Sequence, residues 1–276
     1  MLKTRVITAL VLLAGFLSAL FLLSPQGWLV LAAAVSGIAA WEWGGFFAAN
    51  ALRRGVFGLL AGGAVVALGF LGGLAEAELS RAPLLITIYG ISAGLWLGCI
   101  PFWLRGHWRL RSPVLAWAAG LLVVVPAGLA LAHIRQVGAT TLLLAMASVW
   151  LADIAAYFVG RAFGRRKLAP TISPGKSWEG ALGAGVAVVI YGLLLWTLGL
   201  ERAMGIRELL LIPLAMAAFT ALSIEGDLFE SLLKRQAGIK DSGRILPGHG
   251  GVLDRIDSLT STLPVVALAL ILLFPQ

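Results

Sequence analysis

Acidic side chains gather in one short stretch of the chain. Six of the 13 aspartates and glutamates lie between positions 225 and 257, together with five basic residues and His249. Mg²⁺ prefers oxygen ligands and is usually held by one or two carboxylates together with substrate phosphates. Basic side chains beside those carboxylates could bind the phosphates. The stretch therefore predicts a site for a divalent cation and a phosphorylated substrate.

The first acidic group lies on one face of a predicted helix. Asp227, Glu230, Ser231 and Lys234 follow one another at spacings of three and four residues. Residues at these spacings lie on the same side of a helix. A solvated helix end stabilised by about a few tenths of a kcal/mol from a carboxylate–lysine pair would show the same pattern. On this helix alone, both interpretations stay open.

A second acidic group begins the next predicted helix. Asp254, Asp257, Ser258 and Ser261 again share one face. The helix dipole favours acidic residues near a helix N-terminus, which is a purely structural explanation. However, two like charges beside lipid repel each other, and a bound divalent cation would relieve that repulsion.

A glycine-rich loop joins these two predicted helices. Residues 240–251 include four glycines and a proline, which disfavour a helix. Glycines also let backbone N–H groups approach an anion closely. The charged or titratable residues of the loop are Lys240, Asp241, Arg244 and His249. Many such loops are only turns, but the flanking carboxylates favour a site for phosphate and metal. Zinc is disfavoured because the chain has one cysteine and three scattered histidines.

Two charged residues further upstream could face the same site. Asp153 lies in an apolar run eight residues before Arg161, about 12 Å along a helix. An ionisable group at that depth usually faces a protein interior or a wet cavity, although a structural hydrogen bond to a neighbouring helix is the alternative. Lys176 follows Ser173 and Pro174, which are predicted to cap and begin a helix. Lys176 could contact either lipid headgroups or a substrate phosphate.

The composition indicates that these residues belong to a membrane protein. Of 276 residues, 60% are hydrophobic and 12% are charged, whereas soluble domains carry about 25% charged residues. Disordered chains are excluded because they are poor in apolar residues. The net charge of +8 does not indicate a nucleic-acid partner, because the basic residues mostly lie between apolar runs.

The apolar runs predict an all-α polytopic integral membrane protein. A bilayer requires about 20 apolar residues per helix. We predict about nine transmembrane helices, at residues 6–23, 28–49, 55–75, 83–104, 113–133, 138–160, 180–199, 207–229 and 259–274. Residues 1–23 also resemble a signal peptide. That stretch is long and no clear cleavage site follows it directly, so we expect an uncleaved first helix.

Basic residues predict the orientation of these helices. With a cytoplasmic N-terminus, 17 of the 21 lysines and arginines fall on the cytoplasmic side and four (Arg81, Arg135, Arg202 and Arg207) on the other. This bias predicts that the C-terminus lies outside and that the acidic stretch faces the cytoplasm. We expect residues 1–140 to form N-terminal scaffold helices that could mediate dimerisation, and residues 141–276 to carry the site.

The segment from Ser231 to Asp257 resembles the signature of the phosphatidate cytidylyltransferases, also called CDP-diacylglycerol synthases. The matching positions are Ser231, Leu233, Lys234, Arg235, Lys240, Asp241, Gly243, Leu246, Pro247, His249, Gly250, Gly251, Asp254, Arg255 and Asp257. The similarity extends upstream through residues 226–231, 173–180 and 153–161. The first 140 residues resemble the family only in being hydrophobic helices.

This resemblance implies the conversion of CTP and phosphatidic acid into CDP-diacylglycerol and pyrophosphate. It also implies Mg²⁺ and a homodimeric enzyme in the lipid bilayer. The residues alone indicate a metal–phosphate site beside lipid; cytidine and diacylglycerol come from the resemblance. We expect the lipid phosphate to attack the α-phosphorus of CTP in line, with catalysis dominated by positioning and charge neutralisation.

The resemblance assigns an expected role to each candidate residue. The expected ligands of Mg²⁺, with room for a second cation, are Asp227, Glu230, Asp254 and Asp257. The expected catalytic residues are Lys234, Arg235, Lys240, Asp241, Arg244, His249 and Arg255. Some of these cations could orient the carboxylates instead of holding phosphates. The expected substrate-binding residues are Asp153, Lys176, Ser231, Gly250 and Gly251.

Two other functions compete with this interpretation. A CTP-dependent polyprenol or phytol kinase would transfer the γ-phosphoryl group and release CDP, but the complete signature argues against it. An ion-coupled transporter would use Asp153 and Glu225 as intramembrane acids. A transporter would not need a cationic glycine-rich loop between two carboxylate-bearing helices.

Overall fold

The computed structural model describes residues 2–76, 82–199 and 205–273, and most of these residues are helical. The first helices are α1 (Leu2–Leu22), α2 (Pro25–Gly45), α3 (Ala51–Leu71) and α4 (Pro83–Gly94). A π-helical turn, η1 (Leu95–Cys99), continues α4 into α5 (Ile100–Gly106). The remaining helices are α6 (Pro113–Val137), α7 (Ala139–Phe163), α8 (Trp178–Gly199), α9 (Ile206–Gln236) and α10 (Leu253–Leu273).

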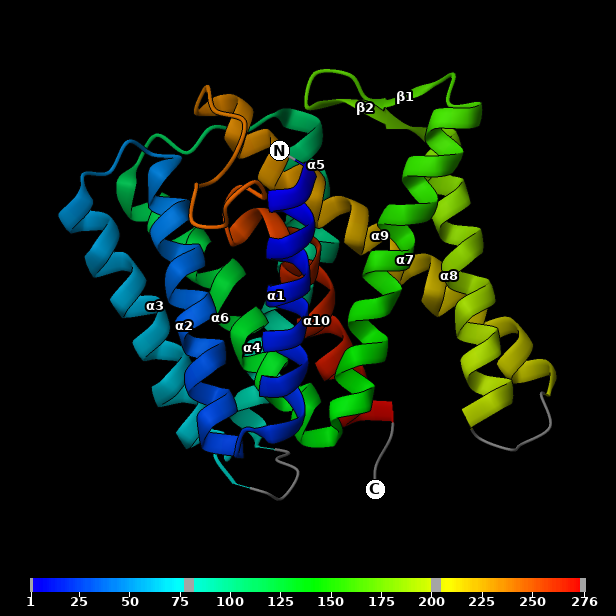
Figure 1. Ribbon diagram of the computed structural model, residues 1–276, viewed down its shortest axis with the longest axis horizontal. Helices are drawn as coiled ribbons and strands as arrows, with labels where there is room; N and C mark the ends of the chain where they lie inside the picture. The colour runs from blue at the N-terminus through cyan, green and yellow to red at the C-terminus, as the bar shows by residue number, and fades with distance from the viewer. Residues whose placement is uncertain (1, 77–81, 200–204, 274–276) are drawn as a thin grey trace.

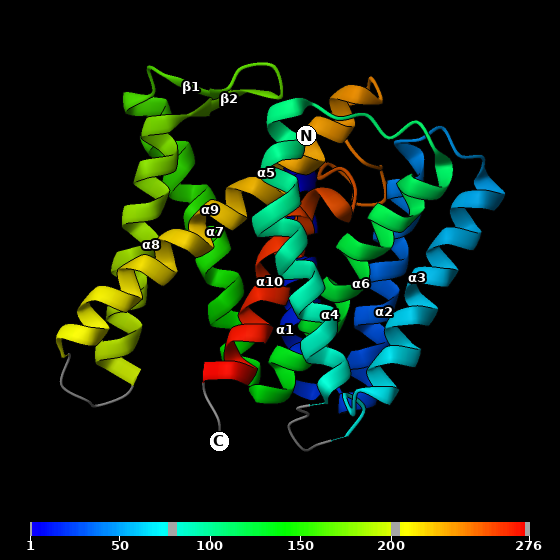
Figure 2. The ribbon, with the colours of Figure 1, turned by 180° about the vertical axis from the view of Figure 1, so that it is seen from behind.

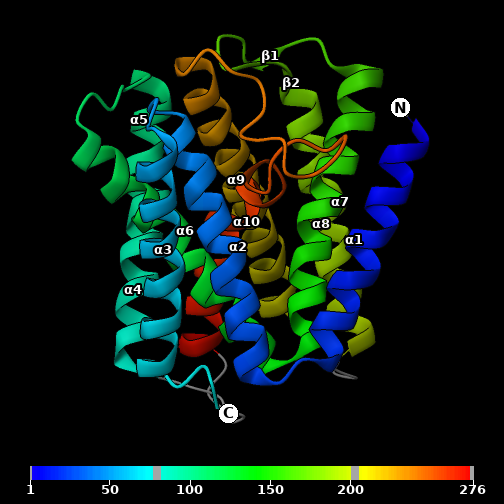
Figure 3. The same ribbon diagram turned by 60° about the vertical axis from the view of Figure 1, so that its left-hand side comes forward.

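The long helices run alternately in opposite directions (Figures 1 and 3). The segments 46–50, 107–112, 164–177 and 237–252 lie at the end from which α1 starts, whereas α10 finishes at the opposite end (Figure 1). Within the described part of the chain, seven helices are long and apolar enough to cross a membrane, and Val6–Leu22 is a shorter apolar helix. The helical, polytopic fold is therefore confirmed. The count of nine and the cytoplasmic N-terminus stay predictions, and Arg81 and Arg202 lie outside the described residues.

Helix α10 packs between two groups of helices. Seen from behind, α7 and α8 stand on one side with the first half of α9, whereas α2, α3, α4 and α6 stand on the other (Figure 2). Helix α10 packs against α9 and α7 and also against α6, α4 and α2. The division of the chain near residue 140 remains a prediction, and α10 contacts helices on both sides of it.

An aromatic cluster holds the C-terminal half of α2 against the C-terminal half of α9. Phe229 of α9 lies 6.1 Å from Trp43, 5.7 Å from Trp96 and 5.3 Å from Trp103, measured between ring centroids. Trp43 also donates a hydrogen bond from Nε1 to the carbonyl oxygen of Ala116 at 2.9 Å. Aromatic side chains bury large apolar areas, and a buried indole N–H needs such an acceptor. The residues next to Phe229 and Trp43 are consequently held on rigid helices.

A β-hairpin replaces part of the helix that the sequence predicts after Ser173. Strands β1 (Lys167–Ala169) and β2 (Ser173–Ser177) pair antiparallel, and α8 begins only at Trp178. The prediction of a helix capped by Ser173 is therefore wrong. Pro174 favours extended backbone in the residue before it, and a serine four positions later supplies the cap. Ser177 Oγ accepts a hydrogen bond from the backbone N–H of Gly180 at 3.2 Å.

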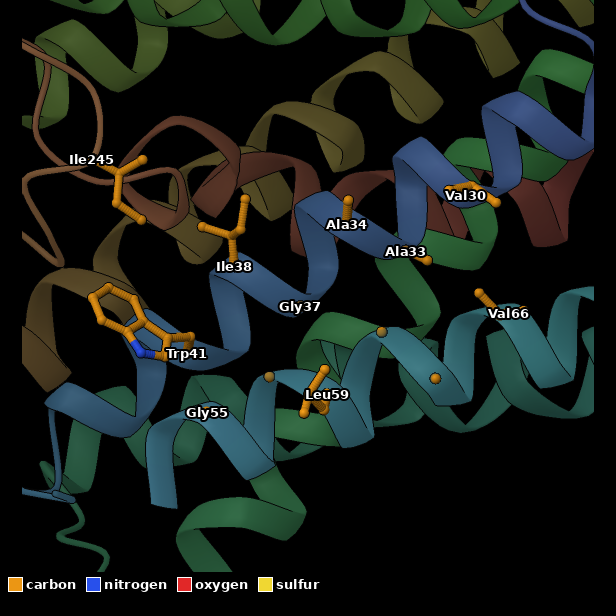
Figure 4. A pocket seen from close by; sticks show the side chains of 13 residues that line it. Val30, Ala33, Ala34, Gly37, Ile38, Trp41, Gly55, Leu59, Val66 and Ile245 are labelled. Atoms are coloured by element: carbon orange, nitrogen blue, oxygen red, sulfur yellow. The ribbon is translucent and has the colours of Figure 1, made fainter. Parts of the chain in front are cut away.

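A groove of about 690 Å³ runs along α2 and α3 and reaches the loop before α10 (Figure 4). Gly55 and Gly63 leave it open, because nothing lies within 4 Å of where their Cβ atoms would be, and Ile38 and Ile245 contribute apolar walls. None of its lining residues is ionisable. This groove is suited to hydrocarbon and does not carry the chemistry predicted from the acidic stretch.

Candidate active site

The two acidic faces meet where α9 and α10 cross. A Cβ atom on Gly226 would lie only 2.6 Å from the carbonyl oxygen of Asp257, so these helices touch backbone to backbone there. Ser258 also donates a hydrogen bond from Oγ to the carbonyl oxygen of Ser223 at 2.9 Å. Asp227 follows Gly226 directly. The two helices that carry the expected ligands of Mg²⁺ therefore pack directly against each other.

Lys234 lies between two buried carboxylates. Its Nζ is 2.6 Å from Asp254 Oδ1 and 3.0 Å from Glu230 Oε2. The exposed fractions of the three side chains are 13% for Lys234, 8% for Asp254 and 4% for Glu230. The sequence leaves two roles open for the basic residues, which are to hold phosphates or to orient carboxylates. In this structure Lys234 orients carboxylates.

The α9–α10 loop (residues 237–252) wraps around the other oxygen of Asp254. Asp254 Oδ2 accepts hydrogen bonds from the backbone N–H groups of Ser242 and Gly251, both at 2.9 Å. Gly250 has a φ of +83°, and a Cβ atom there would lie 2.7 Å from Asp254 Oδ2. Both features call for glycine. The anion that these glycines approach in the structure is the protein's own carboxylate.

A buried glutamate from α2 also contacts this loop. Glu42 has no solvent-exposed surface, and its carboxylate accepts hydrogen bonds from Ser242, Val252 and Leu253. Glu42 is not among the site residues predicted from the sequence, although it lies in a predicted membrane span that contains no other Asp, Glu, Lys or Arg. The reasoning applied to Asp153 would have found it.

Three further carboxylates lie near one another, and one of them pairs with Lys176 of β2. Lys176 Nζ lies 2.5 Å from Asp227 Oδ2, and Ser231 Oγ donates a hydrogen bond to Asp227 Oδ1 at 3.2 Å. The negative charges of Asp153 and Asp257 both interact repulsively with that of Asp227. The structure thus brings α7, α9, α10 and β2 to one site. We call Asp153, Asp227, Glu230, Asp254 and Asp257 the acidic cluster.

Carboxylate oxygens outnumber cations in the acidic cluster. Among the described residues, no lysine or arginine forms an ion pair with Asp153 or Asp257. Glu230 Oε1 is buried and has no hydrogen-bond partner among the residues that the structure describes. No three acidic, histidine or cysteine side chains of the described residues are close enough to hold a metal ion by themselves. The carboxylates of Asp153 and Asp257, which have no ion pair within the described part of the chain, and the unpartnered Oε1 of Glu230 fit a cation that takes most of its ligands from phosphates and water.

The remaining basic candidates lie around the acidic cluster. Arg255 donates to the carbonyl oxygen of His249 from Nε at 3.0 Å and from Nη2 at 2.6 Å, which fixes the end of the α9–α10 loop. Arg235 donates from Nε to the carbonyl oxygen of Ile172 at 3.3 Å, beside β2. His249 is half-buried, whereas Lys240, Asp241 and Arg244 are exposed on the loop.

His107 lies outside this arrangement and provides a test of its limits. Its Nε2 is 3.0 Å from Thr171 Oγ1, at the turn between β1 and β2. Because His107 contacts no member of the acidic cluster, His107→Ala should leave turnover of the purified protein within about twofold of the wild type, as is usual for surface substitutions. A severe loss of turnover, with normal protein yield, would show that the site extends to this face.

The fold and the site together define a class of protein. Four elements bring carboxylates and a lysine to one end of a polytopic helical bundle, beside a loop with exposed basic residues. Clustered carboxylates next to cations are typical of enzymes that act on phosphate groups with a divalent cation. The arrangement is that of a membrane-embedded phosphate-handling enzyme.

Comparison with known proteins identifies the family. The cytidylyltransferase family matches residues 3–273. The phosphatidate cytidylyltransferase of Pseudomonas aeruginosa is 43% identical, over 97% of this chain and 96% of its own length. Those of Haemophilus influenzae and Brucella suis are 36% and 39% identical and cover at least 93% of both chains. The chain therefore belongs to the cytidylyltransferase family, and the match includes the first 140 residues.

Proposed function

We propose that this protein is a phosphatidate cytidylyltransferase, which converts CTP and phosphatidic acid into CDP-diacylglycerol and pyrophosphate. The observation that carries the proposal is the acidic cluster, where Lys176 pairs with Asp227 of α9 and further carboxylates approach from α7 and α10 at one end of the helical bundle. Full-length relatives bear the name of this activity.

The chain's own residues would act by positioning and by neutralising charge. The phosphate monoester of phosphatidic acid is already a nucleophile at neutral pH, so no general base is required. Lys176 lies beside the carboxylates and would contact a phosphate, and the exposed Lys240 and Arg244 would bind the triphosphate from the loop. Lys234 would keep Glu230 and Asp254 in place, as it does in the structure.

We propose that the acidic cluster holds Mg²⁺. Asp227, Glu230 and Asp257 would provide ligands, no more than two of them to one ion, and Asp153 would face them from α7. Asp254 belongs to the same proposed set, since only Lys234 pairs with its Oδ1 among the described residues. When bound, the ion would neutralise charge on the reacting phosphates.

The proposal includes a location and an assembly. The end of the bundle that carries the α9–α10 loop would face the cytoplasm at the inner membrane, as the distribution of basic residues predicts. Phosphatidic acid could then reach the site from the inner leaflet without its acyl chains leaving lipid. We further propose that the enzyme is a homodimer.

An assay of the purified protein tests the activity. The protein in detergent or lipid is supplied with radiolabelled CTP, phosphatidic acid and Mg²⁺, and the products are separated. We expect pyrophosphate and labelled CDP-diacylglycerol in equal amounts, and at least a tenfold loss of product when a chelator removes the metal. Release of CDP with a phosphorylated lipid would identify a kinase instead. The absence of CTP turnover with native, correctly folded protein would reject both.

A further inference from the structure

Glu42 connects the N-terminal helices to the active-site loop. Its Oε2 accepts hydrogen bonds from Leu253 N–H at 2.7 Å and from Ser242 Oγ at 2.9 Å, and its Oε1 accepts one from Val252 N–H at 3.0 Å. Leu253 is the first residue of α10. The Glu42 carboxylate therefore caps α10 from another helix and satisfies two backbone N–H groups near its start. A negative charge at this end of a helix is also favoured by the helix dipole.

The loop is shaped to admit this carboxylate. A Cβ atom on Gly243 or on Gly251 would collide with the Glu42 carboxylate oxygens. That carboxylate is fully buried and held by three hydrogen bonds, so it has little freedom to move aside. Neither glycine has the positive φ that would by itself favour glycine, so both are required by the space that Glu42 occupies.

Glu42 and Asp254 hold the same loop from opposite helices. Ser242 donates its backbone N–H to Asp254 and its hydroxyl group to Glu42. Gly251 donates to Asp254, and the next residue, Val252, donates to Glu42. Any movement of Glu42 would therefore shift the backbone that surrounds Asp254 and the start of the helix that carries Asp257.

Helix α2 holds Glu42 firmly. The adjacent Trp43 is hydrogen-bonded to Ala116 of α6 and packs against Phe229, the residue before Glu230. Rigid support of this kind is what a side chain needs if it is to fix the geometry of another group.

We infer that Glu42 is a positioning residue of the cytidylyltransferase reaction. It sets the α9–α10 loop and the start of α10, and through them the placement of Asp254 and Asp257. This inference rests on the proposed function for its kinetic consequence, but its structural consequence can be measured without any activity. Partners that orient metal ligands typically change affinity or activity by about 10- to 100-fold when they are lost.

Two measurements on the full-length protein test the inference. In Glu42→Gln an amide NH₂ replaces one acceptor and faces backbone and hydroxyl donors. We expect its kcat to fall by about 10- to 100-fold, with the KM for phosphatidic acid within twofold. Independently of activity, trypsin should cut after Lys240 and Arg244 at least tenfold faster than in the wild type. Glu42→Asp keeps the negative charge, so its kcat and its resistance to trypsin should lie between those of Glu42→Gln and the wild type.

Further variants separate positioning from general stability. Gly243→Ala leaves the Glu42 side chain chemically unchanged, but the added Cβ atom displaces its carboxylate. This variant should therefore reproduce both effects of Glu42→Gln. Glu76→Gln makes the same chemical change at an exposed site beyond α3 and should change neither. The inference is overturned if Glu42→Gln retains wild-type kcat and loop protection, or if its loss of activity matches a loss of folded protein. If CDP-diacylglycerol synthesis is absent altogether but trypsin sensitivity responds as expected, the proposed function fails and the structural role of Glu42 stands.

Discussion

Asp254→Asn should lower the rate of CDP-diacylglycerol formation by a factor on the order of 10²–10³, the usual cost of removing one positioned charged or polar group from an active site. The substitution is nearly isosteric, but it removes the charge that pairs with Lys234 and replaces one carboxylate oxygen by an NH₂ group. The asparagine oxygen can either face Lys234 or accept from the two loop N–H groups, whereas Asp254 does both. Initial rates at saturating CTP, phosphatidic acid and Mg²⁺ measure the effect.

Protein yield and membrane topology should be unchanged in Asp254→Asn. Tryptic cleavage of the α9–α10 loop then shows how much of the loss comes from loosening of the loop and how much from the missing charge. A variant that retains more than a tenth of wild-type turnover would exclude Asp254 from the reacting centre.

Lys234→Met should be the most damaging change to folding. It would leave Glu230 and Asp254, with side chains only 4% and 8% exposed, without their shared cation. Breaking a buried ion pair by removing one partner typically costs about 3–5 kcal/mol, because the other charge stays buried and unpaired. We expect a clear fall in thermal stability in detergent together with loss of activity.

A second substitution separates folding from chemistry at Lys234. In Lys234→Met the carboxylates of Glu230 and Asp254 are buried without a cation, and adding Glu230→Gln removes one of these two negative charges. The double variant Lys234→Met/Glu230→Gln should therefore regain much of the lost thermal stability and remain inactive, a non-additive result expected of residues in contact. If Lys234→Met alone melts like the wild type, the three side chains do not form a buried ion cluster in the native protein.

Local patterns in the sequence predicted the helices that carry the site. The spacing of Asp227, Glu230 and Lys234 placed them on one face of a helix, and Glu230 and Lys234 do form an ion pair four residues apart. Asp254 and Asp257 were expected at the start of the next helix, and both lie in the first turns of α10. Helical periodicity determines these relations within a few residues of chain, so they can be found without knowledge of the fold.

Contacts between distant segments could not be predicted in the same way. Glu42 lies 200 residues before Ser242, and the packing of α2 against α6 and α10 brings it to the loop. The loop glycines were assigned to a bound phosphate because glycine permits close approach of any anion, and the pattern does not reveal which one. In the structure the anions are Asp254 and Glu42. The cap of α8 moved from Ser173 to Ser177 because pairing with β1 keeps Ser173 extended.

Buried carboxylates of α2 and α10 serve as counter-anions for the α9–α10 loop, and this should separate the effect of salt on the conformation of the loop from the effect of salt on substrate binding. The backbone N–H groups of Ser242, Gly251 and Val252 are bound to buried carboxylates, whereas Lys240 and Arg244 are exposed to solvent. Exposed charges are screened over about 8–10 Å at physiological ionic strength, and buried pairs much less. Rising ionic strength should therefore weaken the attraction between the loop and a polyanionic nucleotide at salt concentrations that leave the conformation of the loop unchanged.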